Sequence, residues 1–405
     1  MTGVTATPRS VIRTPGIIAL MSMSALGFAG FGALVSTVPL WAVRGGADEV
    51  GGGLVNAVMM AATVAVQTTV PAALRRFGWT PTLVAGVALL GAPSLMLLMT
   101  DALPAILAIS AVRGAGFAVI TVCGSSAVAM LVEPARRGRA IGLYGLSISA
   151  PQILLVPTSV WVADNVGFWV VFAIGAAPLI ATVPAFLLAR RLDRMPHAPS
   201  ADHLPHRTSA RVWLALIAPS VVLLTITAPG GALLTFVPQF PEVGGYAVAG
   251  LFALTACAAV ARWLIGGLAD RFGHLPFQPP MLLLGAAGLA LCVWSMAGGG
   301  GAALVGGMAV TGIAYGSLQN VTLIESFAAV GSRHRDVASA VWNIGFDCGT
   351  GIGALVVGFI AARTSFGVAL STTSAVCLVV AVAVLVRILI GRSRRAARRD
   401  PSVHG

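Results

Sequence analysis

Apolar residues run through this chain in twelve stretches, separated by polar connections that carry most of its charges. Each stretch reaches the length of about 20 residues that a helix needs to cross ~30 Å of hydrocarbon. Helices also satisfy every backbone hydrogen bond within a bilayer. The pattern therefore predicts an all-α membrane protein with membrane-spanning helices over residues 16–41, 51–74, 80–99, 103–131, 138–163, 166–189, 212–240, 245–269, 276–297, 302–328, 336–362 and 366–390.

One connection, residues 190–211, is long, polar and rich in proline. It predicts a six-helix bundle over residues 1–189, a linker over 190–211, a second bundle over 212–390 and a basic tail over 391–405. The linker histidines His197, His203 and His206 have no acidic or cysteine partner at ligand spacing, so a solvated linker is favoured over a metal site.

The arginines alternate between the connections. Of the 25 arginines, 21 fall on every second connection or in the terminal segments, and the opposite face carries only Arg44 and Arg363. By the positive-inside rule, both termini are cytoplasmic. The first stretch is too long for a signal peptide and has no clear cleavage site.

The composition is typical of a membrane protein. Charged residues make up 9% of the chain, hydrophobic residues 57%, and the mean hydropathy is +0.93. The net charge of +12 follows from this arginine pattern and is scattered over separate loops and a tail, without a single groove-forming basic surface, which argues against nucleic-acid binding. The absence of lysine suggests a GC-rich genome and hence a bacterial plasma membrane. The five cysteines lie inside apolar stretches and are interpreted as packing residues.

The two halves resemble repeats. Phe77-Gly78 follows the second stretch as Phe272-Gly273 follows the eighth, at a shift of 195 residues. Arg137-Gly138-Arg139 similarly corresponds to Arg333-His334-Arg335. Parallel duplication of six-helix units is typical of one group of secondary transporters, which hold the substrate near the bilayer midplane where the halves meet.

The sequence Gly-Gly-Leu-Ala-Asp-Arg-Phe-Gly over residues 266–273 resembles the loop signature G-x-L-a-D-R-x-G of the major facilitator superfamily. Arg262 before it, and Arg113 with Gly114 and Gly116, resemble further family features. The resemblance implies two pseudo-symmetric six-helix bundles that transport by alternating access. Residues 338–343 with Asp347 resemble a drug- and sugar-efflux-type branch.

Four ionisable residues, Arg113, Arg262, Glu325 and Asp347, lie inside predicted helices, where a charge costs at least ~2.5–3.5 kcal/mol. Asp347, near the midplane, is interpreted as a carboxylate that exchanges a proton for a cation. A static ion pair is its structural alternative. Arg113, also near the midplane, is expected to assist coupling, contact a substrate anion or pair structurally. Glu325 joins the proton-coupling candidates.

A conformational latch is predicted at the cytoplasmic ends. Arg262, Gly266 and Asp270 share one helix face, and with Arg271, Gly273 and Glu325 they are expected to form a lock in the second half. The first half departs from the pattern, because Arg75 replaces the aspartate of the second copy. Since the eleventh stretch begins with Asp336, an Arg75–Asp336 pair is predicted.

Uncharged polar and amphipathic residues in the stretches are candidates for a substrate cavity, since they face lipid only at a cost. Gln239 is assigned to the outer surface. The cavity candidates are Asn56, Gln67, Tyr144, Gln152, Tyr315, Gln319, Asn320, Trp342 and Asn343. A lining with aromatic rings and few polar groups favours an amphipathic solute.

These features favour proton-coupled export of small hydrophobic or amphipathic molecules, with an uptake symporter or organic-anion carrier as the alternative. The expected partners are a substrate, protons and membrane lipids, with a monomer as the default and no cofactor. An enzyme is disfavoured because no nucleophile–base set lies at membrane depth. An ATP-driven pump would need a phosphate-loop lysine. A membrane scaffold or sensor stays open.

Overall fold

The computed structural model describes residues 12, 14–133, 137–195, 209–240, 245–330 and 334–399, apart from the side chains of residues 129, 137–139, 270, 336 and 391–399. Every regular element in these ranges is a helix. Eleven segments are long and apolar enough to cross a membrane, and one of them, Leu275–Val330, has 56 residues and contains two helices. The described chain thus has twelve crossing helices, and the all-α membrane fold is confirmed.

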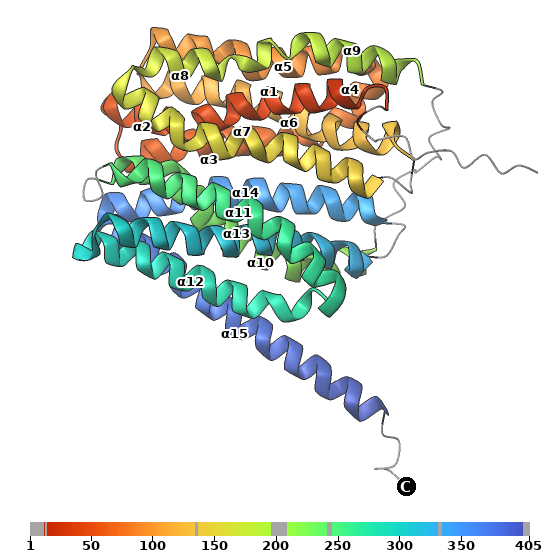
Figure 1. The fold of residues 1–405 in the computed structure, drawn as a ribbon, viewed down its shortest axis with the longest axis vertical. Helices are drawn as coiled ribbons and strands as arrows, with labels where there is room; N and C mark the ends of the chain where they lie inside the picture. The colour runs from red at the N-terminus through yellow and green to blue at the C-terminus, as the bar shows by residue number, and fades with distance from the viewer. Residues whose placement is uncertain are drawn as a thin grey trace, which may run out of the picture. The chain divides into compact units, whose positions relative to one another are not determined.

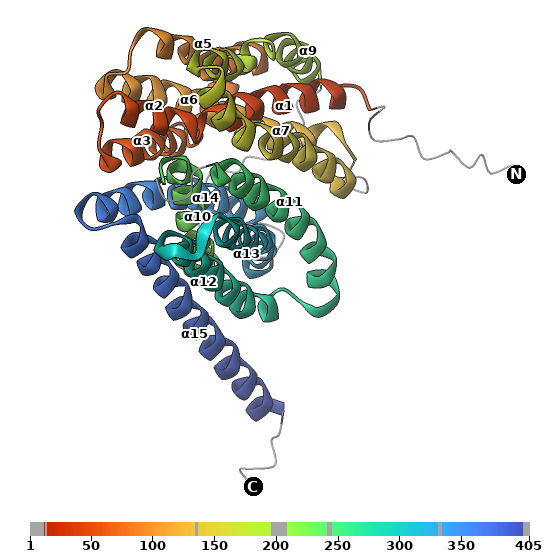
Figure 2. The same ribbon diagram turned by 60° about the vertical axis from the view of Figure 1, so that its left-hand side comes forward.

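The chain forms two compact units, Met1–His206 and Arg207–Gly405, and the boundary falls within the connection predicted as a linker. The helices of the first unit lie side by side in Figures 1 and 2. A core of aliphatic and aromatic side chains, with Phe168 and Phe172 against Trp41, packs between them. Its helices are α1 (Ile17–Leu34), α2 (Thr37–Arg44), α3 (Glu49–Gln67), α4 (Val70–Phe77), α5 (Trp79–Met96), α6 (Leu103–Leu131), α7 (Arg137–Asn165), α8 (Phe168–Gly175) and α9 (Thr182–Asp193).

The second unit has six long helices around a core that includes Val222, Ile226 and Leu318. In Figure 2, the last helix runs along the side of its unit and ends beyond the other helices. That helix continues to Arg399, into the segment predicted as a basic tail. The helices are α10 (Ala210–Phe236), α11 (Tyr246–Phe272), α12 (Gln278–Trp294), α13 (Gly300–Val330), α14 (Arg335–Arg363) and α15 (Phe366–Arg399).

Three stretches predicted as single helices are broken, and each contains a proline at or near the break. Pro39 follows the α1–α2 break, Pro71 follows the α3–α4 break, and Pro178 lies between α8 and α9. Proline has no N–H for the carbonyl four residues earlier. At the first break that carbonyl belongs to Val35, and it accepts a hydrogen bond of 2.8 Å from the side-chain amide of Asn56. The break is therefore satisfied inside the bundle, as a membrane requires.

The helices α12 and α13 form a hairpin whose turn is made of glycine. Gly298 and Gly300 have φ values of 106° and 72°, a left-handed conformation that favours glycine. Beyond the turn the two backbones approach closely. A Cβ atom on Gly307 would lie 2.7 Å from the carbonyl oxygen of Gly288.

The two Phe-Gly pairs that indicate a repeat end their helices in the same way. The helix α4 ends at Phe77 and α11 at Phe272, each followed by a glycine. Gly78 and Gly273 have φ values of 83° and 80°, and each N–H bonds to the carbonyl four residues earlier. Equivalent helix ends at a shift of 195 residues are what a duplicated unit predicts.

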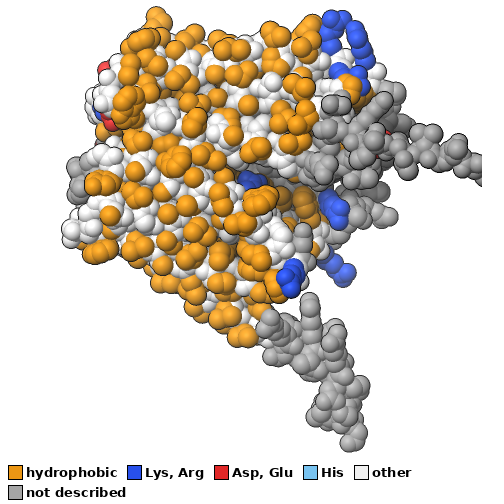
Figure 3. All heavy atoms as spheres, in the orientation of Figure 1, with side chains coloured by type: hydrophobic (Ala, Val, Ile, Leu, Met, Phe, Trp, Pro, Cys, Tyr) orange, Lys and Arg blue, Asp and Glu red, His pale blue; other side chains and the backbone are white. Residues whose placement is uncertain are grey.

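The surface in Figure 3 is mainly hydrophobic, and arginine side chains gather near helix ends. Many large aliphatic side chains of the crossing helices are exposed, among them Val183, Leu214 and Val379. Such a surface is suited to acyl chains and not to water. The chain is therefore a multi-pass membrane protein.

Candidate functional site

Helices α11, α13 and α14 of the second unit bring four of the predicted site residues together with a fifth residue, Phe346. We call Arg262, Tyr315, Gln319, Trp342 and Phe346 the arginine–aromatic cluster. Its members come from three helices, and α13 packs closely against α11. Predicted neighbours of the cluster include Asn320, Asn343 and Asp347.

Arg262 is held in the cluster at three points. Its Nη1 atom donates to Oε1 of Gln319 at 3.1 Å, and its guanidinium carbon lies 5.9 Å from the ring centroid of Trp342. Its backbone carbonyl accepts from the side-chain amide of Asn320 at 2.7 Å. A desolvated cation over an aromatic face gains about 2 kcal/mol. The charge is thus stabilised by a neutral amide and a ring, in place of an acid.

The aromatic rings of α13 and α14 contact one another in a row. Trp342 and Phe346 stack with centroids 5.8 Å apart, and Tyr315 lies 6.3 Å from Phe346. The indole Nε1 of Trp342 donates to Thr322 Oγ1 at 3.0 Å, which fixes the ring. Gly230 on α10 makes room for Tyr315, because a Cβ atom there would lie 2.3 Å from the phenol ring.

Asp347 follows Phe346 directly and is buried, with 5% of its surface exposed. Tyr315 interacts electrostatically with both Arg262 and Asp347, so the two opposite charges flank one phenol. A buried carboxylate in a membrane helix is expensive unless it is paired or functional. The sequence singled out Asp347 by its depth in the helix alone. Its location beside the arginine–aromatic cluster makes it the leading candidate for proton or cation binding.

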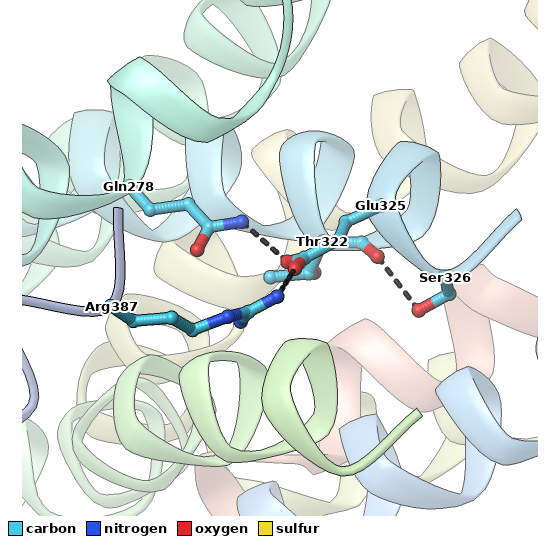
Figure 4. A network of polar contacts seen from close by, with 5 residues as sticks. All are labelled: Gln278, Thr322, Glu325, Ser326 and Arg387. Carbon is cyan, nitrogen blue, oxygen red and sulfur yellow. Dashed lines mark hydrogen bonds and ion pairs between the residues drawn. The ribbon is translucent and has the colours of Figure 1, made fainter. Parts of the chain in front are cut away.

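Glu325 belongs to a separate network at the end of α13, drawn in Figure 4. Its carboxylate is 5% exposed and accepts from Arg387 Nη2 at 2.9 Å and from the amide of Gln278. The expected association of Glu325 with Arg262 is therefore wrong, because each has other partners. The physical reason is that α15 places Arg387 within 2.9 Å of the Glu325 carboxylate, whereas Arg262 binds Gln319 and Trp342.

Thr322 connects this network to the arginine–aromatic cluster. Its hydroxyl accepts from Trp342 and donates to the carbonyl of Leu318 at 2.7 Å. One turn later, Ser326 donates to the carbonyl of Thr322 at 2.8 Å, as Figure 4 shows. Glu325 lies on the same helix between Thr322 and Ser326, so the two groups of contacts are neighbours on α13.

Arg113 of α6 has no comparable support in the first unit. It is 2% exposed, and its Nε and Nη2 atoms have no hydrogen-bond partner among the described residues. Ser110, one turn earlier, also carries a buried hydroxyl without a partner. Thr63 of α3 donates to the carbonyl of Gly114 at 3.0 Å, beside the arginine. A guanidinium whose buried Nε and Nη2 atoms find no partner among the described residues is suited to bind a transient anion.

Several cavity candidates use their polar atoms within their own unit. Asn343 donates to Ser339 and Gln152 to Ile148, each one turn back in its own helix. Asn56, as described above, completes the α1–α2 break and is 2% exposed, so its contact is structural. Gln67 is buried, and Tyr144 packs its hydroxyl end against Gly124, where a Cβ atom would lie 2.4 Å away.

The predicted latch residues are only partly visible. Arg75 is exposed at the end of α4, and Arg271 lies over the ring of Phe272 at 5.1 Å. Gly266 faces Asn320, whose amide nitrogen would lie 3.3 Å from an added Cβ atom. The side chains of Asp270 and Asp336 lie outside the described residues, so the Arg75–Asp336 pair stays a prediction.

Four residues of the site were not expected from sequence: Gln278, Thr322, Phe346 and Arg387. Arg387 carried a usable signal, since it interrupts the apolar run from Leu385 to Ile390. A charge at that place needs a partner as much as Glu325 does. Gln278, Thr322 and Phe346 have residue types common in membrane helices, and only the packing reveals their contacts.

A profile of the Major Facilitator Superfamily matches residues 20–329, more than half of the chain. The chain therefore belongs to the Major Facilitator Superfamily, a family of transporters and not of enzymes. No curated protein matches the sequence.

Several solved structures share the fold. The peptide transporter POT in complex with sulfate has a TM-score of 0.73 at 16% identity, covering 95% of this chain and 96% of that one. The nucleoside transporter NupG has a TM-score of 0.67 at 13% identity, covering 92% and 98%. A bacterial homologue of the human lysosomal transporter Spinster, in an inward-facing, unoccupied conformation, has a TM-score of 0.67 at 16% identity, covering 93% and 94%. These identities support the fold alone.

Proposed function

We propose that this membrane transporter is a proton-coupled exporter of small hydrophobic or amphipathic molecules in a bacterial plasma membrane. The observation that carries the proposal is the buried carboxylate of Asp347 beside the arginine–aromatic cluster. A carboxylate binds either a proton or a cationic group, so the two ligands compete, which is the elementary requirement of antiport.

The rings support the solute class. Trp342, Phe346 and Tyr315 offer an extended apolar surface, while the polar atoms of Gln319 and Asn320 already bind Arg262. A sugar would require more convergent hydrogen-bond donors and acceptors. An amphipathic solute with a planar ring and a basic nitrogen would stack on the rings and approach Asp347.

Transport in everted membrane vesicles or proteoliposomes tests the proposal. With a panel of amphipathic amines, a pH gradient should drive accumulation by the native protein. Asp347→Asn should abolish gradient-driven accumulation, whereas Asp347→Glu should retain part of it. Asp164→Asn is the matched control, because Asp164 belongs to the first unit, is exposed and pairs with Arg44.

The results separate the alternatives. Gradient-independent accumulation would remove proton coupling. An unchanged Asp347→Asn phenotype would favour a scaffold or sensor. Arg113, whose Nε and Nη2 atoms have no partner among the described residues, favours one second candidate, an organic-anion carrier. That function predicts transport of carboxylates or sulfonates that is lost in Arg113→Gln.

A further inference from the structure

A groove runs along the outside of the first unit between the start of α1 and the end of α9. Its volume is about 530 Å³, within the range of small-molecule sites. Its lining is almost entirely aliphatic and consists of Gly16, Ile18, Ala19, Ser22, Val183, Pro184, Leu187 and Arg191. Ile18 and Val183 are 63% and 67% exposed. Because both helices cross the membrane, these side chains face the bilayer.

A positive charge stands at one end of the groove. The Nε atom of Arg191 donates to the carbonyl of Pro15 at 3.2 Å, which holds the guanidinium across the start of α1. Arg190 lies beside it in the last turn of α9, and Arg194 follows the end of that helix. Figure 3 shows arginine side chains at this end of the unit. No acidic side chain in the described part of the chain forms an ion pair with Arg191.

The nearby acid, Asp193, is already engaged. Its carboxylate accepts from the backbone N–H groups of Trp79 and Thr80 at 2.9 and 3.2 Å, and from the Thr80 hydroxyl at 2.8 Å. It thereby caps the positive N-terminal end of α5. The end of the groove therefore keeps a positive charge that forms no ion pair with the described acidic side chains, next to an apolar channel that is open to lipid.

We propose that the groove binds one anionic phospholipid, with an acyl chain along Ile18, Val183 and Leu187 and the phosphate on Arg191. A guanidinium binds phosphate with two parallel hydrogen bonds, and basic pockets between membrane helices favour anionic headgroups. Ser22 is the one polar residue of the lining besides Arg191, so a polar solute would find few partners. The proposal needs only a membrane location and does not depend on proton coupling or export.

Native mass spectrometry of the detergent-purified full-length protein tests the site, because individual bound lipids are resolved. The protein is titrated with phosphatidylglycerol and, separately, with phosphatidylcholine. The first phosphatidylglycerol should bind more tightly than phosphatidylcholine. Arg191→Gln should weaken phosphatidylglycerol binding about fivefold, which corresponds to the ~1 kcal/mol of one arginine near an anionic headgroup, and leave phosphatidylcholine unchanged.

A second pair of variants separates the groove from general surface charge. Ala19→Trp fills the apolar channel and should weaken both lipids, whereas Ala85→Trp, on the exposed face of α5, should weaken neither. Arg76→Gln removes an exposed arginine of the same unit outside the groove and should leave the first binding event unchanged.

Three results would overturn the proposal. If Arg76→Gln weakens phosphatidylglycerol binding as much as Arg191→Gln, the lipid responds to diffuse charge and not to a site. If removal of residues 2–12 increases phosphatidylglycerol binding, the chain's own N-terminal segment is the occupant of the groove in the full-length protein. Equal binding of phosphatidylglycerol and phosphatidylcholine by the native protein would also contradict it.

Discussion

Glu325 and Arg387 form an ion pair whose two side chains are buried to very different extents. We therefore expect the two single substitutions to differ in how much they destabilise the second unit. The side chain of Glu325 is 5% exposed, whereas that of Arg387 is 49% exposed. Loss of the acid leaves an arginine that reaches a polar environment by extending its long side chain. Loss of the arginine leaves a buried carboxylate with the Gln278 amide as its remaining side-chain donor. Arg387→Gln should therefore destabilise the second unit more than Glu325→Gln.

The magnitudes follow from the contacts. Removal of one member of a buried pair costs about 3–5 kcal/mol, and a hydrogen bond to a charged group contributes ~1.5–3 kcal/mol. Because half of Arg387 is exposed, we reduce the cost of Arg387→Gln to about 2 kcal/mol. Glu325→Gln keeps a neutral hydrogen bond to Gln278 and should cost about 1 kcal/mol. A loss of 1 kcal/mol lowers the Tm of a unit of this size by ~2–4 °C. Tm should therefore fall by about 4–8 °C in Arg387→Gln and by about 2–4 °C in Glu325→Gln.

Thermal unfolding in detergent, followed by tryptophan fluorescence, measures these shifts. The double variant completes a thermodynamic cycle and should show a coupling of about 1 kcal/mol between the two side chains. Arg363→Gln serves as the control, because Arg363 is exposed and lies over Phe359 without an acid. A larger effect of Glu325→Gln than of Arg387→Gln, or a coupling near zero, would refute the reasoning.

Two further predictions concern unpaired charge and close packing. Arg113→Met should raise Tm by several degrees, because a guanidinium with two unpartnered nitrogen atoms among the described residues costs ~2.5–3.5 kcal/mol in a membrane helix. A lower Tm would show that Arg113 is a structural member of a pair. Gly316→Ala should destabilise the second unit by about 1–3 kcal/mol, since the new Cβ atom would lie 1.9 Å from the carbonyl oxygen of Ala258. Gly267→Ala, with nothing within 4 Å, should instead be neutral or stabilising by up to ~1 kcal/mol, and equal effects of both alanines would contradict the packing argument.

The sequence predicts the helices well because membrane burial leaves a strong signal in composition. It predicts neither the helix breaks nor the partners of the buried charges. Pro71 indicates a break only once its missing hydrogen bond is considered, and the same holds for Pro39 and Pro178. Apolar content alone extends each helix through its proline.

The partners of charged residues depend on packing between distant segments. Glu325 and Arg387 are separated by 62 positions, and nothing in local spacing relates them. A count of arginines by membrane face assigns Arg387 to topology and hides its structural role. Arg262 shows the opposite case, because its depth correctly indicates an unusual charge, yet an amide and an indole stabilise it in place of the expected acid.

The glycines at helix crossings bear on how relatives of this protein adapt to new cargo. Cβ atoms on Gly316 and Gly353 would lie 1.9 and 2.0 Å from carbonyl oxygens on the facing helices, so these backbones already touch. Helices whose backbones are in direct contact leave no room for a larger side chain at the crossing, so their spacing is fixed. Under the proposed function, evolution toward a bulkier cargo would proceed by replacing rings such as Trp342 and Phe346 with smaller side chains on an unchanged helix frame. Lineages with different cargo should accordingly share the glycines and diverge at the rings.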